Sequence, residues 1–159
     1  MIRKLEVTVM FLRKNGQILL GLKKRGFGAG KYNGIGGKIR PHETPEHAAV
    51  REVQEEILVT PTQYQQLGQL EYDTFYKGEK EHIILHVFVA TAWSGTPTES
   101  DHMAPKWFDE SKIPYNLMFP DDSYWLPCVL EGKYVTGTFE YNVHECLLSQ
   151  NVTVSEAAK

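Results

Sequence analysis

Residues 37–59 read GKIRPHETPEHAAVREVQEEILV, and this stretch decides the local fold. Thr44 offers an N-cap hydroxyl and Pro45 is a preferred first helical residue, so a helix is predicted from Thr44 to about Leu58. Apolar residues at positions 49, 50, 53 and 57 form one stripe along this helix. The stripe is expected to pack against the rest of the fold.

Three carboxylates lie on a second face of the predicted helix. Glu52, Glu55 and Glu56 stand at i, i+3 and i+4, so their side chains are neighbours. Glu55 and Glu56 are also in the last turn, where the helix dipole disfavours negative charge. A divalent cation would neutralise them, and Mg2+ is commonly shared between carboxylates and substrate phosphates. The alternative is a solvated acidic face, partly offset by Arg51 pairing with Glu55.

The residues before this helix favour a ligand site over a bare acidic face. Six of the twelve residues from Gly26 to Gly37 are glycine, which favours a loop that approaches a ligand closely. Gly36 and Gly37 can present uncovered backbone groups to a metal or a phosphate. The stretch contains neither a P-loop nor a dinucleotide-binding glycine motif.

The rest of the chain has mostly extended patterns. Asn15-Gly16 predicts a tight turn between the first two strands. The predicted strands cover residues 5–12, 17–22, 63–72, 81–93, 106–108 and 134–143, and a second helix is predicted at 123–131. Interspersed strands and two separate helices predict an α+β fold with helices packed on a mixed sheet. Residues 1–159 are expected to form one domain with a frayed tail at 151–159.

Composition excludes several classes of protein. The formal net charge of -3, from 17 Lys+Arg and 20 Asp+Glu, gives no basic excess for binding a nucleic-acid polymer. No stretch of about 18 apolar residues could span a bilayer, and the N-terminus lacks the apolar core of a signal peptide. Cys128 and Cys146 are too few for a disulfide framework. We therefore expect a soluble cytoplasmic protein without a membrane or nucleic-acid partner.

The stretch from Gly37 to Val59 resembles the Nudix box, G-x5-E-x7-R-E-U-x-E-E-x-G-U, in which U is an aliphatic residue. Every defining position matches except Leu58, which stands where the box has its final glycine. A leucine in a left-handed helix end costs on the order of 1 kcal/mol, unless the chain leaves the helix differently. The family uses Mg2+ to hydrolyse a nucleoside diphosphate linked to another group.

Segments outside the box resemble the oxidised purine nucleoside triphosphatase branch of this family. They are residues 19–30, Asn33, 95–97, 99–101 and 120–125. The resemblance implies a Nudix fold, with a mixed β-sheet sandwiched between helices. It also implies hydrolysis of 8-oxo-dGTP or 2-hydroxy-dATP to the monophosphate and pyrophosphate, with Mg2+ as cofactor and Mn2+ as its alternative. We expect the protein to act as a monomer on this small-molecule substrate.

The resemblance assigns roles to the acidic helix and its preceding loop. The implied metal ligands are three glutamates and one backbone carbonyl, namely Glu52, Glu55, Glu56 and that of Gly36. The same three glutamates are the implied catalytic residues, with Glu56 or a neighbour as the base. Lys23 would reach the phosphates, whereas Glu43 and Arg51 would form a structural ion pair.

The Asp121-Asp122 pair is the implied reader of the base. By itself, such a pair before a helix is more typical of an N-cap and turn. A guanine edge presents an acceptor at O6 and donors at N1 and N2, so one protonated and one ionised carboxyl can read it. Moving that proton would suit 2-hydroxyadenine. The other implied substrate-binding residues, for which core packing is the alternative, are Thr8, Phe27, Asn33, Met103 and Phe119.

Four positions depart from the branch. Phe119 replaces a tryptophan that stacks on the base, and Tyr72 and Thr74 replace aromatic residues near the pocket. His102 replaces a glutamate associated with metal and catalysis, and a neutral imidazole is a poorer Mg2+ ligand than a carboxylate. These departures leave two alternatives open. One is a Nudix hydrolase of another nucleotide, such as an alkylated purine triphosphate or a dinucleotide, and the other is a non-catalytic nucleotide-binding domain.

Overall fold

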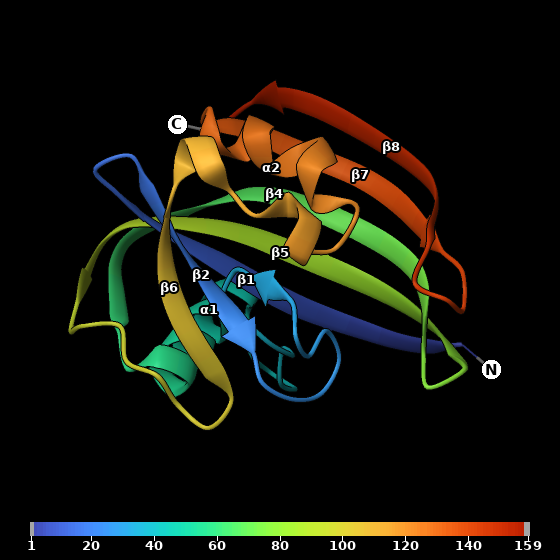
Figure 1. The fold of residues 1–159 in the computed structure, drawn as a ribbon, viewed down its shortest axis with the longest axis horizontal. Helices are drawn as coiled ribbons and strands as arrows, with labels where there is room; N and C mark the ends of the chain where they lie inside the picture. Colours follow the sequence, from blue (N-terminus) through green and yellow to red (C-terminus); the bar gives the residue numbers. More distant parts are fainter. Residues whose placement is uncertain (1, 158–159) are drawn as a thin grey trace.

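The computed structural model describes residues 2–157, which form a curved mixed sheet with a helix on each side (Figure 1). The strands are β1 (Arg3–Lys14), β2 (Gln17–Lys23), β3 (Tyr32–Asn33), β4 (Thr60–Tyr76), β5 (Glu79–Ser94), β6 (Met103–Asp109), β7 (Lys133–Tyr141) and β8 (Leu147–Glu156). The helices are α1 (Pro45–Ile57) and α2 (Asp122–Leu130), with short 3-10 turns at Glu110–Lys112 and Tyr115–Leu117. The predicted α+β class is confirmed.

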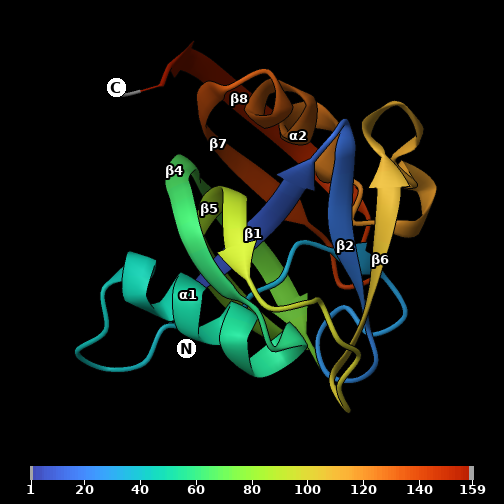
Figure 2. The same cartoon turned by 90° about the vertical axis from the view of Figure 1, so that its left-hand side faces the viewer.

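The sheet has the strand order β3-β2-β1-β5-β4-β7-β8, and β6 pairs with β2. β1 runs parallel to β5 and β4 runs parallel to β7, whereas the other pairs are antiparallel. The predicted turn between the first two strands is confirmed, with positive φ angles at Asn15 and Gly16. β1, β4 and β5 therefore lie in the middle of the sheet (Figure 2).

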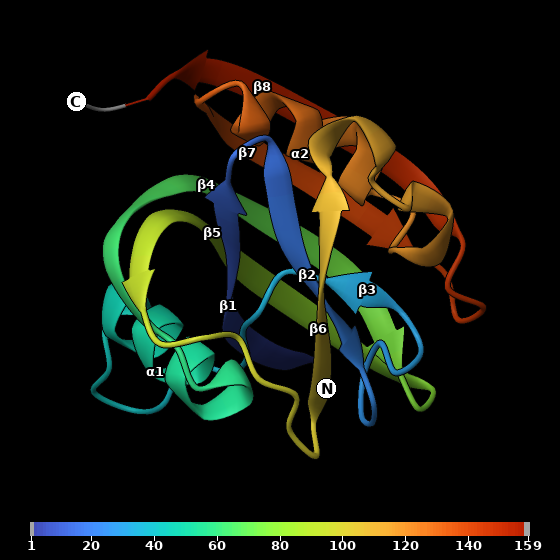
Figure 3. The same cartoon turned by 60° about the vertical axis from the view of Figure 1, so that its left-hand side comes forward.

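Two hydrophobic cores lie on opposite faces of this sheet, and β1 contributes to both. Val9 and Phe11 pack in the core that includes Trp125 of α2, whereas Met10 and Leu12 pack in the core that includes Val53 of α1. This division follows from the alternation of side chains along a strand. Figure 3 shows α1 and α2 on different sides of the strands. No helix within residues 2–157 is long and apolar enough to cross a membrane.

The prediction of a frayed C-terminal tail is wrong for residues 151–156. These residues belong to β8, which pairs antiparallel with β7 from Lys133 opposite Glu156 to Tyr141 opposite Leu147. Most side chains of β8 are exposed, so its place depends on main-chain hydrogen bonds that its polar sequence did not reveal. The central strands are also longer than predicted at both ends.

Helix α1 begins and ends close to the predicted residues. The Thr44 side chain accepts a hydrogen bond from the His47 amide, and Pro45 is the first helical residue, as predicted. Leu58 ends the helix with φ 61° and ψ 34°, and its amide donates to the Gln54 carbonyl. The chain thus leaves the helix in the left-handed conformation that a glycine would adopt.

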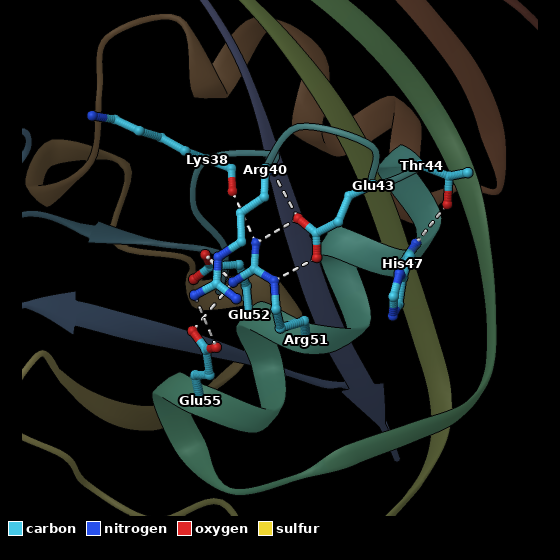
Figure 4. Close-up of polar contacts among 8 residues, drawn as sticks. All are labelled: Lys38, Arg40, Glu43, Thr44, His47, Arg51, Glu52 and Glu55. Atoms are coloured by element: carbon cyan, nitrogen blue, oxygen red, sulfur yellow. Dashed lines mark hydrogen bonds and ion pairs between the residues drawn. The ribbon is translucent and has the colours of Figure 1, made fainter.

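Arg51 ties α1 to the loop that precedes it (Figure 4). Its guanidinium donates to both Glu43 carboxylate oxygens, at 2.6 and 2.8 Å, and to the Lys38 carbonyl at 3.0 Å. It also donates to Glu52 at 2.9 Å and to Glu55 at 3.2 Å. This geometry supports the structural role expected for Glu43 and Arg51, since the bidentate pair fixes loop and helix together.

Replacing Leu58 with glycine is expected to stabilise the fold. The left-handed conformation costs a side-chain-bearing residue about 1–2 kcal/mol, part of which the greater freedom of glycine in the unfolded chain offsets. Leu58 is 62% exposed, so little packing is lost. We expect the free energy of unfolding of Leu58→Gly to rise by about 0.5–1 kcal/mol in urea denaturation. An unchanged or lower value would contradict this account of the helix end.

Acid is expected to remove the stabilisation that comes from Glu43. Hydrogen bonds from Arg51 are the main cause that lowers the pKa of Glu43 to about 2. Because the folded pKa lies below the unfolded value of 4.5, the stabilisation is complete above 4.5 and is lost as the pH falls towards 2. Urea denaturation should show Glu43→Gln less stable than the native chain at pH 7, with the difference vanishing near pH 2. Glu46→Gln, in the exposed first turn of α1, is the control and should show no such convergence.

Candidate active site

A single cavity of about 410 Å3 collects the predicted substrate-binding residues. Its floor is the middle of the sheet, and its walls come from the glycine-rich loop after β2 and the segment before α2. All eight of the predicted residues line it, namely Thr8, Lys23, Phe27, Asn33, Met103, Phe119, Asp121 and Asp122. The volume falls within the usual range for small-molecule sites.

Asp121 lies at one end of the cavity in a closed hydrogen-bond network. Its Oδ2 accepts from the Tyr72 hydroxyl at 2.6 Å and from the Trp125 indole at 2.8 Å, and its Oδ1 accepts from the Tyr141 hydroxyl. The Asp121 amide donates back to the Tyr141 oxygen at 3.0 Å. The side chain makes no N-cap hydrogen bond to α2, so the capping alternative does not apply to it. Three donors stabilise the ionised form of this carboxyl.

The surroundings of Asp122 differ from those of Asp121. It is 3% exposed, and its Oδ2 has no hydrogen-bond partner. Burial, and then the neighbouring Asp121 carboxylate, raise the pKa of Asp122 well above its ordinary value. Asp121 thus accepts three hydrogen bonds, whereas the surroundings of Asp122 favour its neutral form. Reading a guanine edge requires one acceptor and one donor of this kind.

Aromatic side chains form the wall beside the Asp pair. The rings of Phe27 and Phe119 stack at 5.5 Å with an interplanar angle of 16°. Tyr76 meets Phe27 edge-on at 5.5 Å. Phe119 thus keeps an aromatic surface where the resemblance expects a tryptophan, with Phe27 packed behind it.

Thr8 and Asn33 also line the cavity. The Thr8 Oγ is buried and has no hydrogen-bond partner, so it is free to bind a ligand. The side-chain Oδ1 of Asn33 accepts from the Gly34 amide at 2.8 Å, which leaves the side-chain NH2 group to donate elsewhere.

Lys23 and the paired glycines also line the cavity. Burial lowers the pKa of Lys23 from its ordinary value, while the carboxylates of Glu56 and Glu52 act to raise it. A Cβ at position 36 would lie 1.8 Å from the Thr8 carbonyl oxygen, so only glycine lets the backbone run this close to β1. A Cβ at position 37 would lie 2.6 Å from the Glu52 carboxylate, which would have to move.

The Gly36 carbonyl is directed away from β1. The neighbouring carbonyls of Ile35 and Gly37 accept hydrogen bonds from the amides of Met10 and Thr8, at 2.7 and 2.9 Å. Successive carbonyls alternate in direction along an extended chain, so that of Gly36 points the other way. It is thereby available as the metal ligand that the resemblance implies.

The three glutamates of α1 have different surroundings. Glu52 is 8% exposed and bound to Arg51, whereas the Glu55 side chain is 48% exposed and contacts both Arg51 and Arg40. Glu56 has a buried Oε2 without a hydrogen-bond partner. Burial, and then Glu52, raise the pKa of Glu56, while His102 and Lys23 act to lower it. Glu56 thus has a buried carboxylate oxygen that no side chain or backbone group occupies.

The donor set is compatible with a divalent cation that also uses substrate oxygens. Within residues 2–157, no three His, Cys, Asp or Glu side chains are grouped closely enough to hold an ion by themselves. Two of the three glutamates give oxygens to Arg51. The free Glu56 oxygen and the Gly36 carbonyl are hard oxygen donors, and Mg2+ completes such partial sets with water and phosphate oxygens.

Some residues around the cavity were not predicted from the sequence. Trp125 and Tyr141 complete the network around Asp121, and Arg3 and Glu81 line the far end of the cavity floor. Trp125 stands about one helical turn after Asp121 within residues 120–125, and this spacing could have suggested the contact. Tyr141, Arg3 and Glu81 lie on strands distant in the sequence, and no local pattern marks them. His102 lies outside the cavity lining and contacts Arg25 at 3.3 Å.

Comparison with known proteins shows which family and which proteins the chain is similar to. It matches the NUDIX domain model over residues 2–128. It is 40% identical over 146 residues to the oxidized purine nucleoside triphosphate hydrolase of Danio rerio, covering 92% of each chain. It is 39% identical over 145 residues to that of Mus musculus, covering 91% of this chain and 92% of the other. The crystal structure of a MutT protein from Bacillus halodurans, 26% identical, superimposes with a TM-score of 0.82 and covers 93% of this chain and 97% of that one.

The family follows from the agreement of these matches with the geometry. The matched residues include the glycine loop, the acidic helix α1 and the Asp pair of the cavity. The resemblance read from residues 37–59 is confirmed, and the chain belongs to the NUDIX domain family.

Proposed function

We propose that the protein hydrolyses oxidised purine nucleoside triphosphates, such as 8-oxo-dGTP, to the monophosphate and pyrophosphate and so cleans the nucleotide pool. The observation that carries this proposal is the cavity itself, whose lining combines the Asp pair, in its two different surroundings, with Lys23 and the glycine loop beside the acidic helix. The relatives at 40% and 39% identity are named for the same activity.

The base end of the cavity fits a guanine edge. A protonated Asp122 can donate to O6, and the ionised Asp121 can accept from N1 or N2. The Asn33 amide and the Thr8 hydroxyl add further hydrogen-bonding groups near the base, and the stacked Phe27 and Phe119 rings bound it. The base is thereby oriented so that the triphosphate extends towards Lys23.

The phosphate end fits a polyphosphate and a divalent cation. The Lys23 ammonium offsets phosphate charge, and the uncovered backbone at Gly36 and Gly37 lets phosphate oxygens approach closely. Glu52, Glu55, Glu56 and the Gly36 carbonyl would hold Mg2+ or Mn2+. When bound, the cation supplies charge neutralisation across the phosphate oxygens and lowers the pKa of the attacking water.

The Glu56 carboxylate is the proposed general base. Its raised pKa lies closer to neutrality than that of an ordinary glutamate, and its Oε2 is free to take a proton from the attacking water. The water oxygen forms the new bond to phosphorus, the bond between the α and β phosphates breaks, and pyrophosphate leaves. In the alternative, a non-catalytic binding domain, this unpartnered carboxylate oxygen would have no function.

Three properties stay predictions from the sequence: that the protein is a monomer, that it lies in the cytoplasm, and that it acts on small nucleotides and not on nucleic-acid polymers. The net charge of -3 supports the preference for small nucleotides, since polymer binding is strengthened by basic surfaces.

A nucleotide panel tests the proposed substrate. Pyrophosphate release with Mg2+ is measured for 8-oxo-dGTP, 2-hydroxy-dATP, methylated purine triphosphates, dGTP and ADP-ribose, and kcat/KM values are compared. We expect an oxidised purine to be preferred. A preference for another member would move the specificity within the family, and no turnover of any member would refute the enzymatic proposal.

Glu56→Gln is expected to lower kcat by about 100- to 10,000-fold, because the amide cannot take the proton from water. The thermal unfolding temperature should not fall, since the substitution removes a buried carboxyl whose charge is disfavoured. Glu46→Gln is the matched control on the same helix, because Glu46 contacts Tyr64 outside the cavity. Native turnover in Glu56→Gln would eliminate Glu56 as the base.

A further inference from the structure

Tyr72 and Tyr141 place two phenolic hydroxyls on the carboxylate of Asp121. Tyr72 lies on β4 and is 9% exposed, and Tyr141 lies on β7 and is 6% exposed. Tyr72 donates to Oδ2 and Tyr141 to Oδ1, so each carboxylate oxygen receives one hydroxyl proton. Trp125 adds a third donor at Oδ2. Every side-chain partner of Asp121 is therefore a donor.

The orientation of these donors leaves little room for a proton on Asp121. The Tyr141 oxygen already accepts from the Asp121 amide, so its own proton is directed back to Oδ1. The Trp125 indole can only donate. A carboxylate has about four lone-pair positions, of which three are used here, and one remains for a single N–H of a base. A proton at that remaining position would neutralise Asp121 and weaken all three hydrogen bonds, because a neutral carboxyl accepts less strongly than a carboxylate.

Asp122 has no such partners. Its Oδ2 is buried and unpartnered, and no positive charge from the described residues bonds to the pair. The titratable groups that face it are Asp121 itself, Tyr72 of β4, Tyr141 of β7 and Tyr115 of the second 3-10 turn. Burial, and then Asp122, raise the pKa of Tyr115 to about 12, so this phenol stays neutral. Of the two carboxyls, Asp122 can hold a proton without weakening the three hydrogen bonds to Asp121.

We propose that Tyr72 and Tyr141 determine base specificity by holding Asp121 as the acceptor and Asp122 as the donor, which commits the site to guanine-type edges. The proposal rests on the proposed function, in which the Asp pair reads the base. Tyr72 and Tyr141 act through Asp121 and are positioning residues.

The two oxidised purines differ in what this arrangement can bind. At position 6 guanine carries the acceptor O6, whereas adenine carries an amino donor. With Asp122 opposite position 6, 8-oxo-dGTP meets a hydroxyl donor, but 2-hydroxy-dATP requires the proton to move to Asp121. That move turns three hydrogen bonds to a charged carboxylate into weaker ones to a neutral carboxyl, so we expect a preference for 8-oxo-dGTP of about 10-fold or more in kcat/KM.

Substitution of the two tyrosines tests the proposal by kinetics. The kcat/KM ratio of 8-oxo-dGTP to 2-hydroxy-dATP is measured for the native chain, Tyr72→Phe, Tyr141→Phe and the double variant. We expect the ratio to fall by about 10-fold in the double variant and by less in each single variant, which also serves if the double variant folds poorly. Tyr64→Phe is the matched control, because its hydroxyl donates to the Glu46 carboxylate at 2.9 Å outside the cavity. An unchanged ratio in the double variant and in both single variants would overturn the proposal.

A spectroscopic measurement tests it without turnover. Carbon-13 NMR of protein labelled at the aspartate carboxyl carbons distinguishes ionised from protonated groups, and Asp121→Asn and Asp122→Asn assign the two resonances. At neutral pH we expect Asp121 ionised and Asp122 protonated, and the tyrosine substitutions should raise the pH at which Asp121 becomes protonated. The reverse assignment would overturn the proposal. If neither nucleotide is hydrolysed by the native chain, the proposed function fails, and the NMR result alone decides where the proton lies.

Discussion

The acidic end of the site depends on the hydrogen bonds and ion pairs that the Arg51 guanidinium makes. It binds both oxygens of Glu43 and one oxygen each of Glu52 and Glu55, as well as the Lys38 carbonyl. One cation thereby joins the loop to the helix and offsets three carboxylates at once. Arg51 also holds the Glu52 carboxylate, which lies 2.6 Å from where a Cβ at position 37 would stand. Glu56 keeps a buried oxygen without a hydrogen-bond partner.

Two groups of crowded carboxylates are stabilised in different ways. On α1, beside the cavity, a permanent cation, Arg51, is bonded to the acids, and a divalent ion would complete the neutralisation. Within the cavity the described structure bonds no cation to the Asp pair, and burial and Asp121 raise the pKa of Asp122, which favours its neutral form. The first arrangement suits phosphates and the second suits a neutral base edge, which agrees with the proposed nucleotide substrate.

The departures from the family pattern leave the acidic face of α1 unchanged. Leu58 adopts the left-handed conformation of the glycine it replaces, so the helix ends in the same way. Phe119 keeps an aromatic wall through its stacking on Phe27. Tyr72 is a departure that adds a hydroxyl to the Asp121 network. The His102 side chain accepts a hydrogen bond from Arg25 at 3.3 Å and does not line the cavity.

Local chemistry in the sequence determined helix α1 with its cap, the first hairpin, the acidic face and the family, because these depend on residues a few positions apart. The eight predicted substrate-binding residues also meet in one cavity. The tertiary structure decided where the polar β8 pairs, that Tyr141 of β7 reaches Asp121, and that the Asp122 Oδ2 is buried without a hydrogen-bond partner. These outcomes depend on strand pairing and burial, which bring together residues that no local pattern connects.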